Sequence, residues 1–180
     1  LLVLLGAGLF YALFPQYLDT TLSAAQALLD YPSSAVKDGS NQHPVEDVAL
    51  LLKMARPGVV YTHNLADKHD THVAVTLKVI EAIRNLALEE RPQRLYGCEV
   101  WRDLDWMIDT DKVAFNLSEN ESLQAALLGV FDSQISGGKR YDLATMGRRR
   151  AHATYHASHD TDKTTGMNFA MDLTPLMHDP

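Results

Sequence analysis

The chain has 180 residues, of which 46% are hydrophobic and 22% charged, and its formal net charge is -7. This length suits one globular domain, and the composition excludes an intrinsically disordered chain, a collagen-like repeat and a multi-span membrane protein. The acidic charge argues against a nucleic-acid-binding surface, and the single cysteine, Cys98, excludes an intrachain disulfide framework. We therefore expect a cytoplasmic protein that binds neither nucleic acid nor membrane, and the sequence is compatible with a homo-oligomer.

The chain opens on an almost wholly apolar run over residues 1–14, which stops at Pro15. The run is shorter than the roughly 20 apolar residues that span a bilayer, and no basic segment precedes it. We expect a buried strand or helix cut off at its start, with the tail of a signal anchor as the alternative. Because the first residue is Leu1 and not methionine, we expect a piece of a longer protein, with residues 1–30 as an uncertain hydrophobic segment ahead of a domain over residues 31–180.

Helical and strand patterns then alternate along the chain. Composition or apolar spacing predicts helices over residues 20–29, 45–55, 118–131 and 144–158, and one beginning near residue 73. The helix that begins near residue 73 is predicted to have an apolar face and an opposite polar face. The apolar face contains Val73, Leu77, Ile80, Ile83 and Ala87, and the polar face contains Lys78, Glu81, Asn85 and Glu89. Short β-branched and aromatic runs predict strands over residues 59–62, 95–101 and 113–117.

Two further signals concern how these elements begin and connect. Ser118 and Glu121 have the spacing of a capping box, which would open the helix over residues 118–131. Alternating helices and strands with short connections predict an α/β fold with a mostly parallel sheet.

The segment with the greatest density of reactive side chains follows the strand over residues 59–62. Residues 63–72 contain three histidines and two aspartates, and ligands of α/β sheets bind beyond the carboxyl ends of the strands. Imidazoles and carboxylates are zinc ligands, and His69 and His72 are close enough in sequence to lie beside one metal ion. The alternative is that Asp70 or Thr71 caps the following helix and that the histidines are solvated.

The lead-in strand with its His-Asp-Thr-His run resembles the PIG-L/LmbE family of zinc-dependent N-acetylglucosaminyl deacetylases, whose motif is commonly His-Pro-Asp-His. The similarity covers residues 31–162 and is closest to a bacterial branch that can be joined to a glucosamine-6-phosphate deaminase-like domain. Further matching runs are Tyr31-Pro32-Ser33-Ser34, Glu99-Val100-Trp101, Phe131-Asp132-Ser133-Gln134 and Gly138-Lys139-Arg140-Tyr141. The resemblance implies a Rossmann-like three-layer domain that binds Zn²⁺ and hydrolyses the N-acetyl group of an N-acetylated amino sugar or its conjugate.

By this resemblance, His72 is a metal ligand and His69 is the catalytic histidine, which stabilises the oxyanion and serves the leaving amine. Asp67 and Asp70 are candidates for fixing the imidazole tautomers, with loop solvation and helix capping as their alternative roles. His63 is a further candidate beside the site. Arg148, within a run of three arginines, is a candidate for meeting an anionic group of the substrate, with a solvated surface position as the alternative.

The family's other two metal ligands and its general base come from an early His-Pro-Asp-Asp-Glu motif, which this sequence does not contain. The nearest similar run begins at His43 and includes Glu46, but it directly precedes a helical pattern and does not follow a strand. We therefore expect a domain that lacks its N-terminal strand and metal-binding loop. It is either part of an active deacetylase or an inactive relative that serves as a sugar-binding or interaction domain.

A second histidine group lies near the end of the chain. His152, His156 and His159 would share one face of the helix predicted over residues 144–158 and just beyond it. The face could form an independent metal site, or it could be a solvated polar surface beside the arginines.

Overall fold

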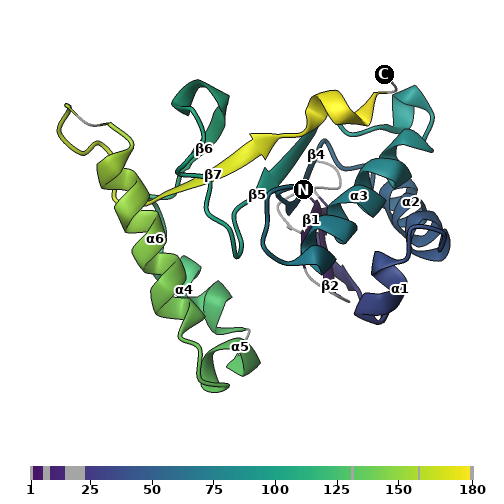
Figure 1. Ribbon diagram of the computed structural model, residues 1–180, viewed down its shortest axis with the longest axis horizontal. Helices are drawn as coiled ribbons and strands as arrows, with labels where there is room; N and C mark the ends of the chain where they lie inside the picture. Colours follow the sequence, from purple (N-terminus) through teal and green to yellow (C-terminus); the bar gives the residue numbers. More distant parts are fainter. Residues whose placement is uncertain (1, 6–8, 15–22, 131, 158, 179–180) are drawn as a thin grey trace. The chain divides into compact units, whose positions relative to one another are not determined.

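The structure, a computed structural model, describes residues 2–5, 9–14, 23–130, 132–157 and 159–178. These residues form an α/β protein, which confirms the predicted fold class (Figure 1). The chain divides into unit 1, which comprises Leu1–Leu104 and Ala170–Pro180, and unit 2, Asp105–Phe169. The two units are described separately below.

The sheet of unit 1 is mixed. Its strands are β1 (Leu2–Leu5), β2 (Leu9–Phe14), β3 (Ser23–Ala27), β4 (Val59–His63), β5 (Arg94–Cys98) and β7 (Met167–Asp172). They lie in the order β3-β2-β1-β4-β5-β7. The central strands β1, β4 and β5 are parallel, whereas β2, β3 and β7 pair antiparallel with their neighbours. The parallel pairing of β4 with β5 places the carboxyl ends of both strands at one edge of the sheet.

The N-terminal part of the chain differs from the sequence prediction. The apolar run forms the two antiparallel strands β1 and β2 rather than one element, with Val3 opposite Tyr11. The helix predicted over residues 20–29 is wrong, because Ser23–Ala27 is strand β3, in which Gln26 lies opposite Tyr11 of β2. Alanine and leucine favour helices only weakly, and pairing with a neighbouring strand overrides that preference. Pro15 and residues 20–22 lie outside the described residues.

The described residues of unit 1 form three α-helices. They are α1 (Ser33–Lys37), α2 (His43–Ala55) and α3 (Asp70–Arg84). Helix α1 was not predicted from the sequence, whereas α2 was predicted to within two residues. Pro44 lies in the first turn of α2, where its missing N–H costs no hydrogen bond, and Arg56 ends the helix in a left-handed conformation with φ of 42°. Short 3₁₀ turns lie at Leu88–Glu90 and Thr174–Met177 in unit 1 and at Asp109–Asp111 in unit 2.

The core of unit 1 lies between these helices and the sheet. Its fully buried side chains come from α2, α3, β4, β5 and the last 3₁₀ turn, and include Val45, Leu52, Val60, Val79, Ile83, Leu95 and Met177. The predicted face of α3 is partly wrong, because Leu77 is 54% exposed while Lys78 is buried. The Lys78 ammonium donates to the backbone oxygen of Asn41 at 2.8 Å, so its aliphatic stem packs in the interior while its charge finds an acceptor.

Unit 2 consists mainly of helices. Its elements are β6 (Lys112–Asn116), α4 (Glu121–Gly129), α5 (Asp132–Ser136) and α6 (Tyr141–Tyr155), and β7 begins within it. The predicted strand at β6 is confirmed, whereas β7 was missed because Met167–Asp172 shows neither alternation nor a β-branched run. The capping box is wrong, because Asn120 precedes α4 and the Ser118 hydroxyl instead donates to Asn116 at 2.6 Å. Phe131 and Ser158, in the predicted helices, lie outside the described residues.

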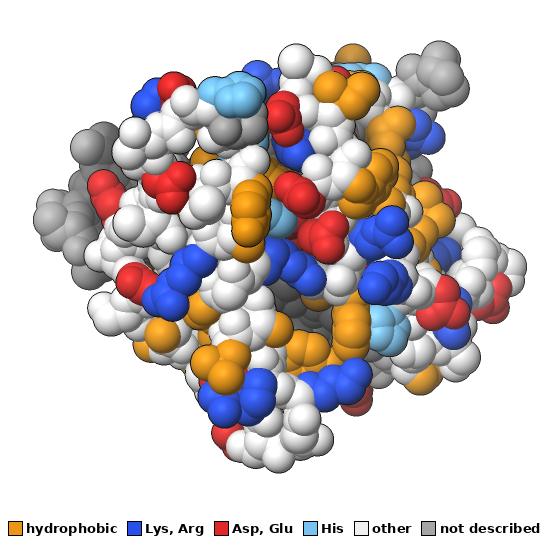
Figure 2. Space-filling view, turned by 60° about the vertical axis from the view of Figure 1, so that its left-hand side comes forward, with side chains coloured by type: hydrophobic (Ala, Val, Ile, Leu, Met, Phe, Trp, Pro, Cys, Tyr) orange, Lys and Arg blue, Asp and Glu red, His pale blue; other side chains and the backbone are white. Residues whose placement is uncertain are grey.

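On the one face that Figure 2 shows, charges of both signs are mixed. On the face shown in Figure 2, Lys and Arg side chains lie among Asp and Glu side chains, with hydrophobic groups between them. In the described part of the chain, no helix has the length and apolar character that crossing a membrane requires.

Candidate functional site

The candidate site lies where β4 ends and the chain turns into α3. Asn64, the first residue after β4, is fully buried and fixes this turn. Its backbone N–H donates to the carbonyl of Cys98 at 3.1 Å, and its side-chain amide donates to the same carbonyl at 3.0 Å. Its side-chain oxygen accepts the N–H of Ala66 at 3.0 Å. The loop that carries the histidines is therefore attached to the end of the neighbouring strand β5.

Gly97 on β5 makes this close approach possible. A Cβ atom at Gly97 would lie 2.8 Å from Cδ1 of Leu173, 3.0 Å from Cα of Asn64 and 3.1 Å from the carbonyl oxygen of His63. The contacts with the backbone of Asn64 and His63 are tighter than most real Cβ contacts, so a residue without a side chain suits this close approach.

Asp67 is the central acceptor of the loop. Its side chain is fully buried, and its Oδ1 accepts the N–H of His69 at 3.0 Å. Its Oδ2 accepts the N–H groups of Trp101 at 3.1 Å and Arg102 at 3.4 Å, which lie in the loop after β5. Burial opposes ionisation of Asp67, but these N–H groups together with His72 outweigh it and lower its pKa. Asp67 is thus a buried carboxylate that joins two loops.

His72 lies in the first turn of α3 and faces this carboxylate. Its Nδ1 is 3.3 Å from Oδ1 of Asp67, at ion-pair distance though without hydrogen-bond alignment, and its side chain is 15% exposed. The ring of His63 stacks on that of His72, with centroids 4.0 Å apart and planes 5° apart. Burial lowers the pKa of His72, and it lowers that of His63 to about 3. Both imidazoles are therefore neutral near pH 7, which is the form that binds metal ions.

His69 occupies a different environment. It is exposed and is the residue immediately before α3, where its carbonyl accepts the N–H of Val73 at 3.2 Å. Its ring centroid lies 5.0 Å from that of His72 and 5.3 Å from that of Trp101. The structure therefore brings together one nearly buried imidazole and one exposed imidazole, with an indole ring beside the exposed one. The sequence prediction placed Trp101 at the end of a strand over residues 95–101, whereas β5 ends at Cys98 and Trp101 lies in the loop after it.

The remaining candidate residues lie elsewhere. Asp70 begins α3, but its side chain is 74% exposed and bonds Lys37 at 3.0 Å. Arg148 lies on α6 in unit 2. His43, in the run rejected above, is at the exposed start of α2, with its Nδ1 3.6 Å from Oε2 of Glu46.

Two of the three histidines of the second group share a face, as predicted. His152 is on α6, His156 ends the helix, and His159 lies beyond it. The rings of His152 and His156 pack on Phe169, with centroid distances of 4.3 and 5.4 Å. Their Nδ1 atoms are 4.0 Å from Asp105 and 3.9 Å from Asp109, respectively. His152 and His156 therefore form a partly buried pair within unit 2, whereas His159 is exposed.

We tested whether the residues after β4 fit a zinc ion. Because Nδ1 of His72 faces Asp67, its Nε2 is the atom that would bind the metal, and the carboxylate would hold the ring in the required tautomer. These residues fit one ligand position and its supporting carboxylate. Among the described residues, no group of three or more His, Cys, Asp or Glu side chains is arranged to hold a metal ion.

Comparison with known proteins adds no assignment: no known family profile matches the chain, and no curated protein matches it significantly.

Proposed function

We propose that this chain is part of a zinc-dependent hydrolase that removes the N-acetyl group from an N-acetylglucosamine-type substrate. One observation carries the proposal. The buried Asp67 carboxylate faces Nδ1 of His72, and the ring centroid of the exposed His69 lies 5.0 Å from that of His72. The resemblance of this segment to the PIG-L/LmbE motif supports it. We also propose the Rossmann-like three-layer form of the α/β fold, which the parallel strands β1, β4 and β5 support.

In this proposal, His72 holds the metal through Nε2, and Asp67 fixes the tautomer of His72. A bound zinc ion would supply an activated water and polarise the amide carbonyl. The two further ligands and the general base come from outside the described residues, either from additional sequence or from a second chain.

His69 acts on the substrate itself. Its exposed ring is free to approach an amide at the mouth of the site, whereas His72 is 15% exposed. Protonated His69 would stabilise the oxyanion and then give its proton to the departing amine. Trp101, next to His69, would provide an apolar surface for one face of the sugar ring.

The second candidate is a non-catalytic relative that binds sugars. The aromatic ring of Trp101 next to the exposed His69 favours this second candidate, because an aromatic ring beside a polar side chain can bind a sugar without any metal. The missing His-Pro-Asp-Asp-Glu motif is also consistent with it.

The test uses the protein as its complete gene encodes it. Acetate release from N-acetylglucosamine conjugates is measured before and after chelation, and again after zinc is restored. We expect release that the chelator abolishes, that zinc restores, and that His69→Ala reduces by at least about a hundredfold. Binding of the sugar, detected by tryptophan fluorescence, without acetate release at any zinc concentration would favour the second candidate and refute the first.

A further inference from the structure

Two threonine hydroxyls are buried directly behind the candidate site. Thr76 lies on α3, one turn after His72, and Thr62 lies on β4, next to His63. Both threonines are buried, and their hydroxyl oxygens are 3.3 Å apart. The mechanism proposed above gives neither of them a role.

The Thr76 hydroxyl connects the two elements that carry these histidines. Its Oγ1 lies 2.8 Å from the carbonyl oxygen of His63, at the end of β4, and 3.2 Å from that of His72, in the first turn of α3. A contact like the one with His72, four positions earlier in the same helix, is common for threonine. The contact with His63 is shorter and crosses from the helix to the sheet. Because the single proton of Thr76 goes to a carbonyl, the hydroxyl of Thr62 is the donor between the two threonines.

This connection bears on the relative position of two imidazole rings. The ring of His63 stacks on that of His72 with their planes 5° apart, although one ring is attached to the sheet and the other to the helix. Pairing of β4 with β5 fixes His63 within the sheet but does not fix it to α3. The hydrogen bond from Thr76 supplies that link at a carbonyl next to the stacked rings. The His72 ring is thus supported on its face by His63 and at its Nδ1 edge by Asp67.

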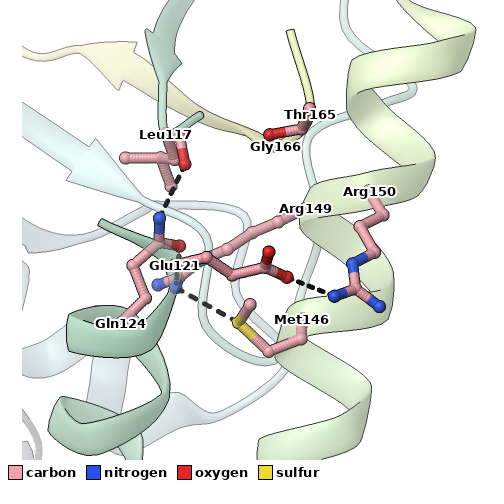
Figure 3. Close-up of a pocket in the computed structure, with 8 residues that line it drawn as sticks. All are labelled: Leu117, Glu121, Gln124, Met146, Arg149, Arg150, Thr165 and Gly166. Carbon is pink, nitrogen blue, oxygen red and sulfur yellow. Dashed lines mark hydrogen bonds and ion pairs between the residues drawn. The ribbon is translucent and has the colours of Figure 1, made fainter. Parts of the chain in front are cut away.

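Polar side chains also join elements in unit 2, but not at the candidate site. Gln124 of α4 donates from its side-chain amide to the carbonyl of Leu117 at 2.6 Å and accepts from Arg149 of α6 at 2.8 Å (Figure 3). The residues drawn with it in Figure 3 include no histidine. Thr76 is different, because both carbonyls that it contacts belong to histidines of the site.

We propose that Thr76 is a positioning residue, which orients the ring of His72 by fixing the backbone of His63 and with it the imidazole on which His72 stacks. A metal bond to Nε2 requires the lone pair of that atom to point at the ion, so groups that hold the ring plane strengthen the bond. The inference rests on the proposed function only where it takes His72 as a metal ligand. The orientation of the ring is tested without any metal.

Two substitutions separate the hydroxyl of Thr76 from its side-chain volume. Thr76→Val keeps the branched shape and removes the hydroxyl, whereas Thr76→Ser keeps the hydroxyl and removes a buried methyl group. The protein as its complete gene encodes it is labelled with ¹³C in its histidines, and the ring signals are recorded by NMR without metal. We expect Thr76→Val to shift the ring signals of His63 and His72, and Thr76→Ser to leave them close to their wild-type positions. His43, at the exposed start of α2, is the internal reference and should not shift in either variant.

Thr62→Val is the matched control. It removes a buried hydroxyl of the same pair but leaves the bond from Thr76 to the carbonyl of His63, so it should shift the two rings less than Thr76→Val does. Unchanged ring signals in Thr76→Val, or a larger shift in Thr76→Ser than in Thr76→Val, would overturn the proposal, because packing would then hold the rings. If Thr76→Val fails to fold by circular dichroism, Thr76→Ala is compared with Thr76→Ser. These two differ in the hydroxyl, and equal shifts would overturn the proposal.

The zinc affinity of the same variants relates the ring orientation to metal binding. Partners that orient a metal ligand typically change the affinity by about 10–100-fold, so we expect Thr76→Val to weaken zinc binding by about tenfold and Thr76→Ser by less than about threefold. Shifted ring signals with unchanged zinc affinity would overturn the positioning role in metal binding. Absence of zinc from the wild type would refute the proposed function, and the NMR comparison would still decide whether Thr76 orients His72.

Discussion

Replacing Asp67 by alanine removes the acceptor that joins the histidine loop to the loop after β5. Three backbone N–H groups lose a buried, ionised partner, and the two closest, those of His69 and Trp101, lie at 3.0 and 3.1 Å from it. Hydrogen bonds to charged groups contribute about 1.5–3 kcal/mol each, so we expect the free energy of unfolding to fall by about 3–5 kcal/mol. This is a large part of the 5–15 kcal/mol or so that stabilises an ordinary domain.

The assay is urea unfolding followed by circular dichroism, with Asp70→Ala as the control. Asp70 is the same residue type three positions later, but its carboxylate is exposed and pairs with Lys37 at the surface, so its removal should change stability little. In the folded fraction of Asp67→Ala, the NMR signals of the His69 and His72 rings should also shift. A loss below about 1 kcal/mol, or one equal to that of Asp70→Ala, would refute the reasoning that Asp67 organises the site.

Three further predictions concern unit 1. Gly97→Ala should lower the free energy of unfolding by about 1–3 kcal/mol, because its Cβ would press against the backbone of Asn64 and His63. Gly58→Ala, with open space around it, should not be destabilising in this way; urea unfolding compares the two variants, and equal effects would contradict the close approach. Burial raises the pKa of the Cys98 thiol to about 12, so Ellman's reagent should label it slowly in the native protein at pH 8 or so and rapidly in urea; equal rates would contradict this. The hydrogen bond to Asp47 raises the pKa of Tyr31 from 10.0 to about 12, so its stabilisation is present below pH 10.0 and lost as the pH rises towards 12. The urea midpoint should therefore fall more steeply with pH above about 10 in the wild type than in Tyr31→Phe, and parallel curves would exclude this linkage.

Local sequence signals predicted the elements that lie next to the candidate site. The strand β4 was predicted because Val59-Val60-Tyr61-Thr62 is a β-branched and aromatic run, and α2 because its apolar spacing is helical and Arg56-Pro57-Gly58 stops it. The histidines after β4 were singled out by their density and by their position at the carboxyl end of a strand. These are properties of short segments, and they do not depend on the rest of the fold.

Features that depend on distant segments could not be predicted. Strand β3 has a helix-like composition and is a strand because it pairs with β2. The importance of Asn64 comes from its bonds to Cys98, 34 positions away in the sequence. Lys78 is buried because the backbone of Asn41 provides an acceptor, which helical periodicity does not reveal. In each case a long-range contact supplies what the local pattern lacks.

The predicted roles differ, with His72 as a metal ligand and His69 as the catalytic histidine, and the different burial of the two side chains supports this difference. His72 is nearly enclosed and faces a carboxylate, whereas His69 is exposed beside Trp101. Substituting His72 should therefore affect metal binding, whereas substituting His69 should affect only the chemistry on the substrate.

The most direct test of the account is the zinc content of the protein as its complete gene encodes it, compared with that of its His72→Ala, His69→Ala and His43→Ala variants. We expect about one zinc ion per chain in the wild type, a loss of zinc in His72→Ala, and retention of zinc in His69→Ala together with the loss of acetate release. His43→Ala, altered at the exposed start of α2, should retain both zinc and activity. Stoichiometric zinc in His72→Ala, or its loss in His43→Ala, would contradict the assignment of the metal site to the end of β4.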